Sequence, residues 1–210
     1  MKQETIKRIL SSIIIIPVVL FFMIKGSVYF IFFLITFFLI SSYEWVKMSK
    51  GKIHLFFGVI FLLLSCYTAY LLRGSNWTEL MTFLFVLLVC VATDIGGYTF
   101  GKIFKGPKLI KISPNKTYSG VIGGYFLSII CANLYVNEFI IFIPIDMELL
   151  ITVFLISSVS QFGDLIISYF KRLSKIKNTG NLLPGHGGLL DRVDGIIFAI
   201  PFAYFLFKLI

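Results

Sequence analysis

Charged side chains are scarce in this sequence. Only 14% of its 210 residues are charged, against about 25% in ordinary soluble domains. Hydrophobic residues make up 58% of the chain and aromatic residues 17%, and the mean hydropathy is +0.96. A soluble domain of this length could not bury so much apolar surface in its core. The composition therefore excludes a soluble globular protein and predicts an integral membrane protein.

Cysteine is also rare. Cys66, Cys90 and Cys131 each stand alone inside an apolar stretch. They have neither the spacing of metal ligands nor the even number that a disulfide framework needs. We interpret them as small packing residues of the membrane interior.

Long apolar runs make up most of the chain. A helix needs about 20 mainly apolar residues to cross the hydrocarbon core of a bilayer, and seven runs approach this length, of which the first and last are short. They cover residues 9–24, 28–46, 53–72, 79–101, 119–143, 148–170 and 195–210. No small-residue cleavage site follows the first run, so we expect a retained span and not a signal peptide.

These runs predict an all-α fold, a polytopic transmembrane bundle of about seven helices. We expect a single membrane-embedded domain over residues 1–210, with N-terminal spans in 1–78 and catalytic spans and loops in 79–210.

The basic residues indicate the orientation. All but three of the 19, namely Lys25, Arg73 and Lys208, fall in the N-terminal tail or in alternate connections between the expected spans. Cytoplasmic connections are enriched in lysine and arginine. The pattern predicts a cytoplasmic N-terminus, and it explains the net charge of +9 without a nucleic-acid partner.

Acidic residues occur at unusual places. Asp94 and Asp164 lie inside expected spans, and Asp191 and Asp194 directly precede the last one. Ionisable residues within a membrane are costly and usually mark a function. In the expected topology all four carboxyl groups lie at a similar level near the cytoplasmic side. Asp94 taken alone could instead simply bond a neighbouring serine or lysine.

The sixth expected span carries a polar stripe. Its polar residues recur at steps of three and four, which places them on one helical face: Ser157, Ser160, Gln161, Asp164, Ser168 and Lys171. Such a stripe must face other protein or water. Serines alone at this spacing would be explained equally well by contacts between helices.

Glycines recur beside Asp94 and at the start of the fifth expected span. Gly97 and Gly101 share a face of the fourth expected span, and Gly120, Gly123 and Gly124 open the fifth. Small residues of this kind let membrane helices come into close contact.

The acids and their basic neighbours suit one kind of chemistry. Carboxylates with few histidine or cysteine partners prefer hard cations such as Mg²⁺, which binds one or two carboxylates together with phosphates. Lysines and arginines around them suit a phosphorylated substrate. The segment SPNKTYSG, with Ser113, Lys116 and Thr117, is expected at the start of the fifth helix, where backbone N–H groups attract phosphate. It is also compatible with an ordinary helix entry.

Residues 168–194, SYFKRLSKIKNTGNLLPGHGGLLDRVD, resemble the defining pattern of the phosphatidate cytidylyltransferases, also called CDP-diacylglycerol synthases. That pattern has a Lys-Arg pair, a Pro-Gly-His-Gly-Gly segment and Asp-Arg-x-Asp. The segments GDL before Ser168, SPNKT and DIGGY around Asp94 also match. The resemblance covers about the last 120 residues, and the first 80 share only hydropathy.

The resemblance implies an enzyme that joins CTP to phosphatidic acid in the bilayer and releases pyrophosphate, with Mg²⁺ as cofactor. It implies metal binding by Asp164 and Asp191, with Asp94 and Asp194 as further or supporting ligands. The implied phosphate contacts are Lys171, Arg172, Lys177, His186 and Arg192. The implied nucleotide-binding residues are Ser113, Lys116, Thr117 and Ser168. It also implies a bacterial inner-membrane protein with a cytoplasmic site, and it is compatible with a homodimer.

Two positions depart from the family pattern. Asn178 stands where the family has aspartate, and Ser119 stands where it has an acidic residue or glutamine. Because asparagine orients loops as well as aspartate does, we expect position 178 to shape the loop and not to bind metal.

Three other functions are alternatives to this one. A CTP-dependent polyprenol or phytol kinase would release CDP, but the full PGHGGLLDRVD segment favours the cytidylyltransferase. An alcohol phosphatidyltransferase is disfavoured because its Asp-Gly-x-x-Ala-Arg pattern is absent from the sequence. An ion-coupled transporter would spread its acids across the bilayer, whereas these acids gather near one side.

Overall fold

The computed structural model describes residues 2–49, 54–110, 113–139, 147–182 and 187–209, with side chains from residue 13 onward except at 114–115. Five helices in this part of the chain are long and apolar enough to span a bilayer. They are α2 (Ser27–Ser49), α3 (His54–Arg73), α4 (Trp77–Phe104), α5 (Tyr118–Phe139) and α6 (Met147–Leu173).

Helices α1 (Lys2–Lys25) and α8 (Ile196–Leu209) begin and end the described chain, and α7 (Leu190–Val193) is a single short turn. The apolar parts of α1 and α8, Ile13–Lys25 and Ile196–Leu209, are shorter than the five long spans. The predicted polytopic helical bundle is confirmed, with helices at all seven expected places.

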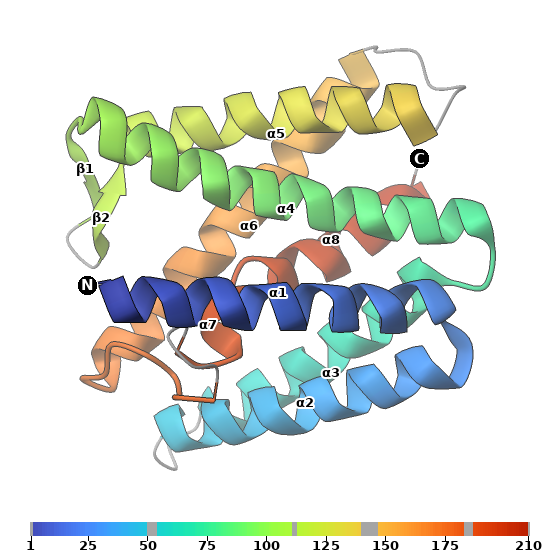
Figure 1. Ribbon diagram of the computed structural model, residues 1–210, viewed down its shortest axis with the longest axis horizontal. Helices are drawn as coiled ribbons and strands as arrows, with labels where there is room; N and C mark the ends of the chain where they lie inside the picture. The colour runs from blue at the N-terminus through green and yellow to red at the C-terminus, as the bar shows by residue number, and fades with distance from the viewer. Residues whose placement is uncertain (1, 50–53, 111–112, 140–146, 183–186, 210) are drawn as a thin grey trace.

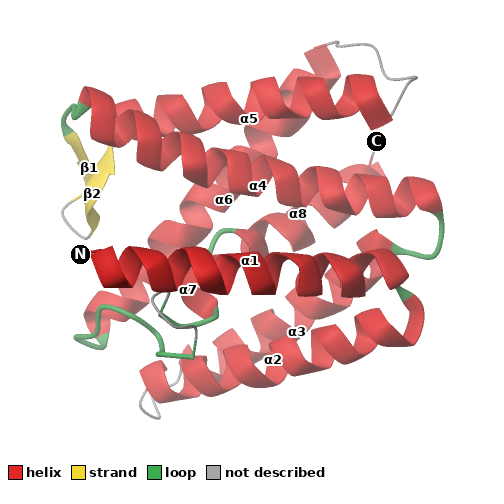
Figure 2. Cartoon of the chain, in the orientation of Figure 1, coloured by secondary structure: helices red, strands yellow, loops and turns green. Residues whose placement is uncertain are grey.

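One element departs from the all-α expectation. Strands β1 (Lys108–Ile110) and β2 (Ser113–Thr117) form an antiparallel pair that leads into α5 (Figure 2). The segment expected to open the fifth helix is therefore a strand, and the helix begins at Tyr118. Pairing of Lys108 with Thr117 provides backbone partners that a helix start would leave open. Thr117 still caps the helix, because its Oγ1 accepts a hydrogen bond from Gly120 N at 3.1 Å.

The helices run back and forth between two ends of the bundle (Figure 1). The start of α1, the end of α2, the β1–β2 hairpin, the end of α6 and α7 lie toward one end. The end of α1, the start of α4 and the end of α8 lie toward the other. The elements that carry the implied site residues therefore meet at the end where the chain begins.

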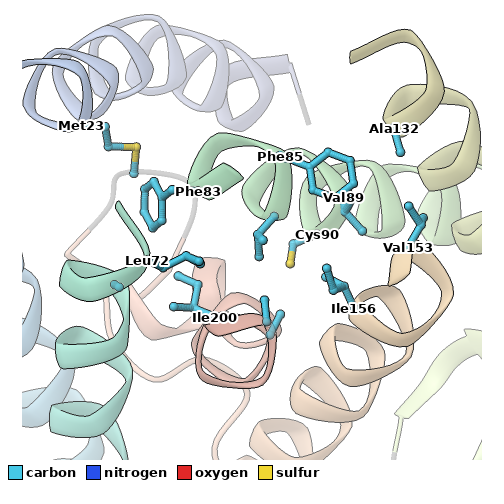
Figure 3. Close-up of a cluster of buried hydrophobic side chains, with 14 of the residues drawn as sticks. Met23, Leu72, Phe83, Phe85, Val89, Cys90, Ala132, Val153, Ile156 and Ile200 are labelled. Carbon is cyan, nitrogen blue, oxygen red and sulfur yellow. The ribbon is translucent and has the colours of Figure 1, made fainter. Parts of the chain in front are cut away.

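Helix α4 runs through the interior of the bundle. Its side chains Phe83, Phe85, Val89 and Cys90 are buried and meet residues from α1, α3, α5, α6 and α8 (Figure 3). Cys66 and Cys90 are buried free thiols, as expected for packing residues. This apolar cluster places one end of α4, with Asp94, beside α5 and α6.

Helices α4 and α5 approach each other closely through glycines. A Cβ on Gly96 would collide with the carbonyl oxygen of Gly123, and one on Gly120 would lie 2.7 Å from the carbonyl oxygen of Gly97. A Cβ on Gly97 itself would lie 3.7 Å from the nearest atom, the carbonyl oxygen of Gly120. The structure therefore leaves no room for a Cβ at Gly96 but enough room for one at the adjacent Gly97.

This difference predicts opposite effects for two alanine substitutions. Gly96→Ala forces the backbones of α4 and α5 apart. It should lower the free energy of unfolding by about 1–3 kcal/mol, as overpacking of a protein core does. Gly97→Ala meets only ordinary contact and gains helix propensity. We expect Gly96→Ala to lower the apparent Tm in detergent by roughly 5 °C and Gly97→Ala to leave it unchanged or raise it. Equal melting of both variants would contradict the close contact.

Candidate active site

Three carboxyl groups from separate elements converge near the hairpin end. Asp94 lies on α4, Asp164 on α6 and Asp194 between α7 and α8. Asp94 interacts electrostatically with Asp164 and Lys116, and Asp194 interacts with both Asp164 and Asp94. The structure therefore brings together acids that are up to 100 positions apart in the sequence, as expected from their common depth.

The hairpin supplies one cation to this cluster. Lys116 on β2 forms an ion pair with Asp164, with Nζ and Oδ2 2.5 Å apart. The other oxygen of Asp164 accepts a hydrogen bond from Ser168 Oγ at 3.3 Å. About a quarter of each paired side chain remains exposed, 24% for Lys116 and 27% for Asp164. Solvent and small ligands therefore have access to this ion pair.

A second cation lies deeper. Lys171 Nζ is 2.9 Å from Asp191 Oδ1 and 3.8 Å from Asp194 Oδ2. All three side chains are at least 88% buried, with exposed fractions of 11%, 8% and 12%. Charges at such depth are costly unless they are paired. Lys171 thus connects α6 to the segment around α7.

Burial raises the pKa of the Asp194 carboxyl well above its usual range. The neighbouring Asp164 and Asp94 carboxylates raise it further, while Lys171 lowers it. Repulsion between neighbouring carboxylates thus adds to the effect of burial. A cation bound among the carboxylates would reduce that repulsion.

Asp191 anchors the loop that connects α6 to α7. Its Oδ2 accepts hydrogen bonds from Thr179 N at 2.8 Å and Gly188 N at 3.1 Å. Its Oδ1 accepts one from Lys171. Gly187 has φ +93°, a conformation that favours glycine, and it brings Gly188 to the carboxylate. Asp191 thus has a structural task in addition to the predicted metal binding, which stays a prediction.

Glu44 is the residue that sequence reasoning missed. It lies on α2, is 3% exposed, and accepts hydrogen bonds from Thr179 Oγ1, Leu189 N and Leu190 N. An acid inside the expected span 28–46 is as unusual as Asp94 or Asp164. That signal could have identified it, although no motif surrounds it.

The other expected site residues differ in position. Ser168 is buried beside Asp164, and Thr117 contacts Ser119 Oγ at 3.0 Å. Arg172, Lys177 and Arg192 are exposed, and Ser113 is half-buried on β2. His186 lies outside the described residues.

The exposed Asn178 lies beside Gly187. The hydrogen bonds that the structure shows at the following residue, Thr179, run to Asp191 and Glu44. The expected loop-shaping role of position 178 stays a prediction.

The acids fit Mg²⁺ only as a partial site. In the described part of the chain no group of three or more histidine, cysteine, aspartate or glutamate side chains is arranged to hold a metal ion. Mg²⁺ keeps several waters and binds through one or two carboxylates plus substrate phosphates. Asp164 and Asp194, which lie close enough to interact, are the two carboxyl groups that such a site would use. Asp94 interacts with Asp164 as well.

Fold and site together define a polytopic helical membrane protein with a carboxylate and lysine cluster at one end of its bundle. A family model described as "Cytidylyltransferase family" matches residues 53–210. The chain belongs to this family.

Curated relatives agree with the family match. A phosphatidate cytidylyltransferase of Rickettsia bellii is 35% identical over 98% of this chain and 91% of its own length. The Rickettsia felis protein of the same name is 33% identical over 98% and 93%. That of Bacillus subtilis is 44% identical, over 61% of this chain and 48% of its own length. The chain thus matches the two rickettsial proteins almost end to end and about half of the Bacillus protein.

Proposed function

We propose that this protein transfers the cytidylyl group of CTP to phosphatidic acid, giving CDP-diacylglycerol and pyrophosphate. The observation that carries the proposal is the junction of Lys171 with Asp191 and Asp194. It lies in the segment that resembles the family pattern, and its Asp194 interacts with Asp164, the partner of Lys116. Relatives that match almost the whole chain are named for this activity.

The reaction needs positioning more than proton transfer. An oxygen of the lipid phosphate, already anionic, attacks the α-phosphorus of CTP. The new P–O bond forms as the bond to the β-phosphate oxygen breaks, and the electron pair leaves with pyrophosphate. No strong general base is required, so catalysis rests on alignment and charge neutralisation.

The described residues divide these tasks. Lys116 and Lys171 lie beside the acids and contribute positive charge for the phosphates, and the exposed Arg172, Lys177 and Arg192 extend that surface. Asp164 and Asp194 would hold Mg²⁺, with Asp191 and Asp94 as neighbours. The metal would supply Lewis-acid stabilisation of the charge on the phosphates.

We also propose a bacterial inner-membrane location with the site on the cytoplasmic side. The site lies at the end of the bundle where the chain begins, and the basic connections favour the cytoplasm for that end. The acyl chains of the lipid substrate would then stay in the bilayer while its phosphate reaches Lys116 and Lys171. The family resemblance is also compatible with a homodimer.

Labelled CTP tests the reaction. The purified protein is incubated with phosphatidic acid, Mg²⁺ and CTP labelled on either the α- or the γ-phosphate, and the lipid is extracted. We expect the α-label in the lipid fraction and the γ-label in water, as pyrophosphate. A γ-label in lipid when a polyprenol replaces phosphatidic acid would indicate the kinase instead. No labelled lipid under either condition would overturn the proposal.

A further inference from the structure

Glu44 is a buried carboxylate whose partners are hydrogen-bond donors. Among the described residues no ion pair with lysine or arginine is formed by it. Instead Oε1 accepts from Leu189 N at 2.9 Å, while Oε2 accepts from Leu190 N at 2.9 Å and Thr179 Oγ1 at 2.8 Å. Hydrogen bonds to an ionised group are about twice as strong as neutral ones. They allow the carboxylate to remain buried at the end of α2.

The loop between α6 and α7 is shaped around this carboxylate. A Cβ on Gly188 would lie 2.5 Å from Glu44 Oε2, and a Cβ on Gly180 would lie 2.7 Å from Oε1. Both distances are too short for a real contact, so larger residues would push the carboxylate out. The position of the Glu44 carboxylate therefore requires glycine at 180 and at 188.

Two carboxylates hold the same loop. Asp191 accepts the backbone N–H groups of Thr179 and Gly188, and Glu44 accepts the Thr179 hydroxyl and the next two backbone N–H groups after Gly188. Thr179 is therefore bound to both acids. Because Asp191 also pairs with Lys171, a displacement of the loop at Thr179 changes the surroundings of that lysine.

We infer that Glu44 is a positioning residue for catalysis: it fixes the end of the loop and the start of α7, which holds Asp191 beside Lys171, and so sets the geometry of the phosphate and metal site. The inference rests on the proposed function. Glu44 lies outside the residues matched by the family model, which begin at 53. Helix α2 is therefore a working part of the site and not only a membrane anchor.

Glu44→Gln tests this with little change in size. The amide has only one oxygen, so at least one of the N–H groups of Leu189 and Leu190 loses its acceptor. A hydrogen bond to a charged group is worth about 1.5–3 kcal/mol, which corresponds to roughly 10–150-fold in kcat/KM. Glu148→Gln, at an exposed position in the first turn of α6, is the matched control.

The kinetic pattern separates positioning from partial unfolding. An inactive fraction lowers the maximal rate but leaves KM for CTP and the half-activating Mg²⁺ concentration unchanged. We expect Glu44→Gln to raise both constants by about tenfold and Glu148→Gln to change neither. Hydrogen exchange measured without substrates should also be faster for the peptide containing Leu189 and Leu190 and unchanged for peptides of α4 and α5.

Thr179→Val is a second, milder variant in case Glu44→Gln purifies poorly. It removes only the hydroxyl that reaches Glu44 and keeps the backbone N–H that reaches Asp191. We expect a smaller rise in KM for CTP and in the half-activating Mg²⁺ concentration. In the double variant Glu44→Gln/Thr179→Val, kcat/KM should fall by less than the product of the two single falls, because both changes remove the same contact.

The outcomes separate the inference from the proposed function. A wild-type protein without CDP-diacylglycerol product refutes the function, while the hydrogen-exchange result still reports on the loop. An active wild type with unchanged KM, unchanged Mg²⁺ dependence and unchanged exchange in both variants refutes the role of Glu44.

Discussion

Asp164→Asn should reduce formation of CDP-diacylglycerol by at least about a hundredfold, because loss of a coordinating charge typically removes several kcal/mol of transition-state stabilisation. The carboxylate lies between Lys116 and Ser168 and interacts with Asp194. An amide preserves the size of the side chain and its contact with Ser168. It removes the charge that would bind Mg²⁺ and orient the lysine.

The measurement is initial rate against Mg²⁺ concentration, with Asp94→Asn for comparison. Asp94 lies at an exposed place on α4, so we expect its substitution to cost less. High Mg²⁺ should recover part of the activity of Asp164→Asn, since weakened binding is offset by concentration. Turnover close to that of the wild type in Asp164→Asn would show that Asp164 is not a metal ligand.

Hydropathy predicted most of the fold because the bilayer restricts what a chain can do. Without water, backbone N–H and C=O groups must bond within each segment, so long apolar runs become helices. All seven expected runs contain a helix. This constraint does not predict strands β1 and β2. Their residues lie beyond the apolar runs, and strand pairing between Lys108 and Thr117 leaves no periodic pattern over so few positions.

The sequence predicted part of the site, because the bilayer also restricts where polar residues can lie. Asp164, Lys171, Asp191 and Asp194 are polar residues in or beside apolar sequence, and the cost of placing them there indicated a function. Their actual partners follow from tertiary contacts that are distant in sequence, such as Lys116 with Asp164. Neither charge patterning nor motif spacing encodes those pairs.

Glu44 shows most clearly why sequence patterns do not predict such contacts. It lies 135 residues from Thr179 and 145 from Leu189, and its donors are largely backbone N–H groups. Backbone donors are identical at every position apart from proline, so no residue pattern reveals which of them a buried acid will bind. The lone acid in an apolar span was the only available sign.

Asp191→Asn should cause the second large loss, in stability as well as in turnover. Asp191 and Lys171 are 2.9 Å apart and only 8% and 11% exposed. Removing one partner of a buried pair leaves the other charge uncompensated and costs about 3–5 kcal/mol. The asparagine oxygen can still accept from Thr179 N and Gly188 N, but its NH₂ group then faces the ammonium of Lys171. We therefore expect a clear fall in apparent Tm together with at least about a hundredfold loss of product formation, because the carboxylate that holds Lys171 in place is lost.

The double variant Lys171→Met/Asp191→Asn distinguishes the two effects. With neither charge present, no isolated ion is buried at this contact, so most of the lost thermal stability should return. Activity should not return, because the ammonium for the substrate phosphates and the carboxylate beside them are both gone. Thermal melting in detergent and the α-labelled CTP assay, applied to the wild type, both single variants and the double variant, give the comparison. Recovery of turnover along with stability would mean that Lys171 and Asp191 only hold the loop in place. An Asp191→Asn single variant as stable and active as the wild type would mean that the pair serves neither purpose.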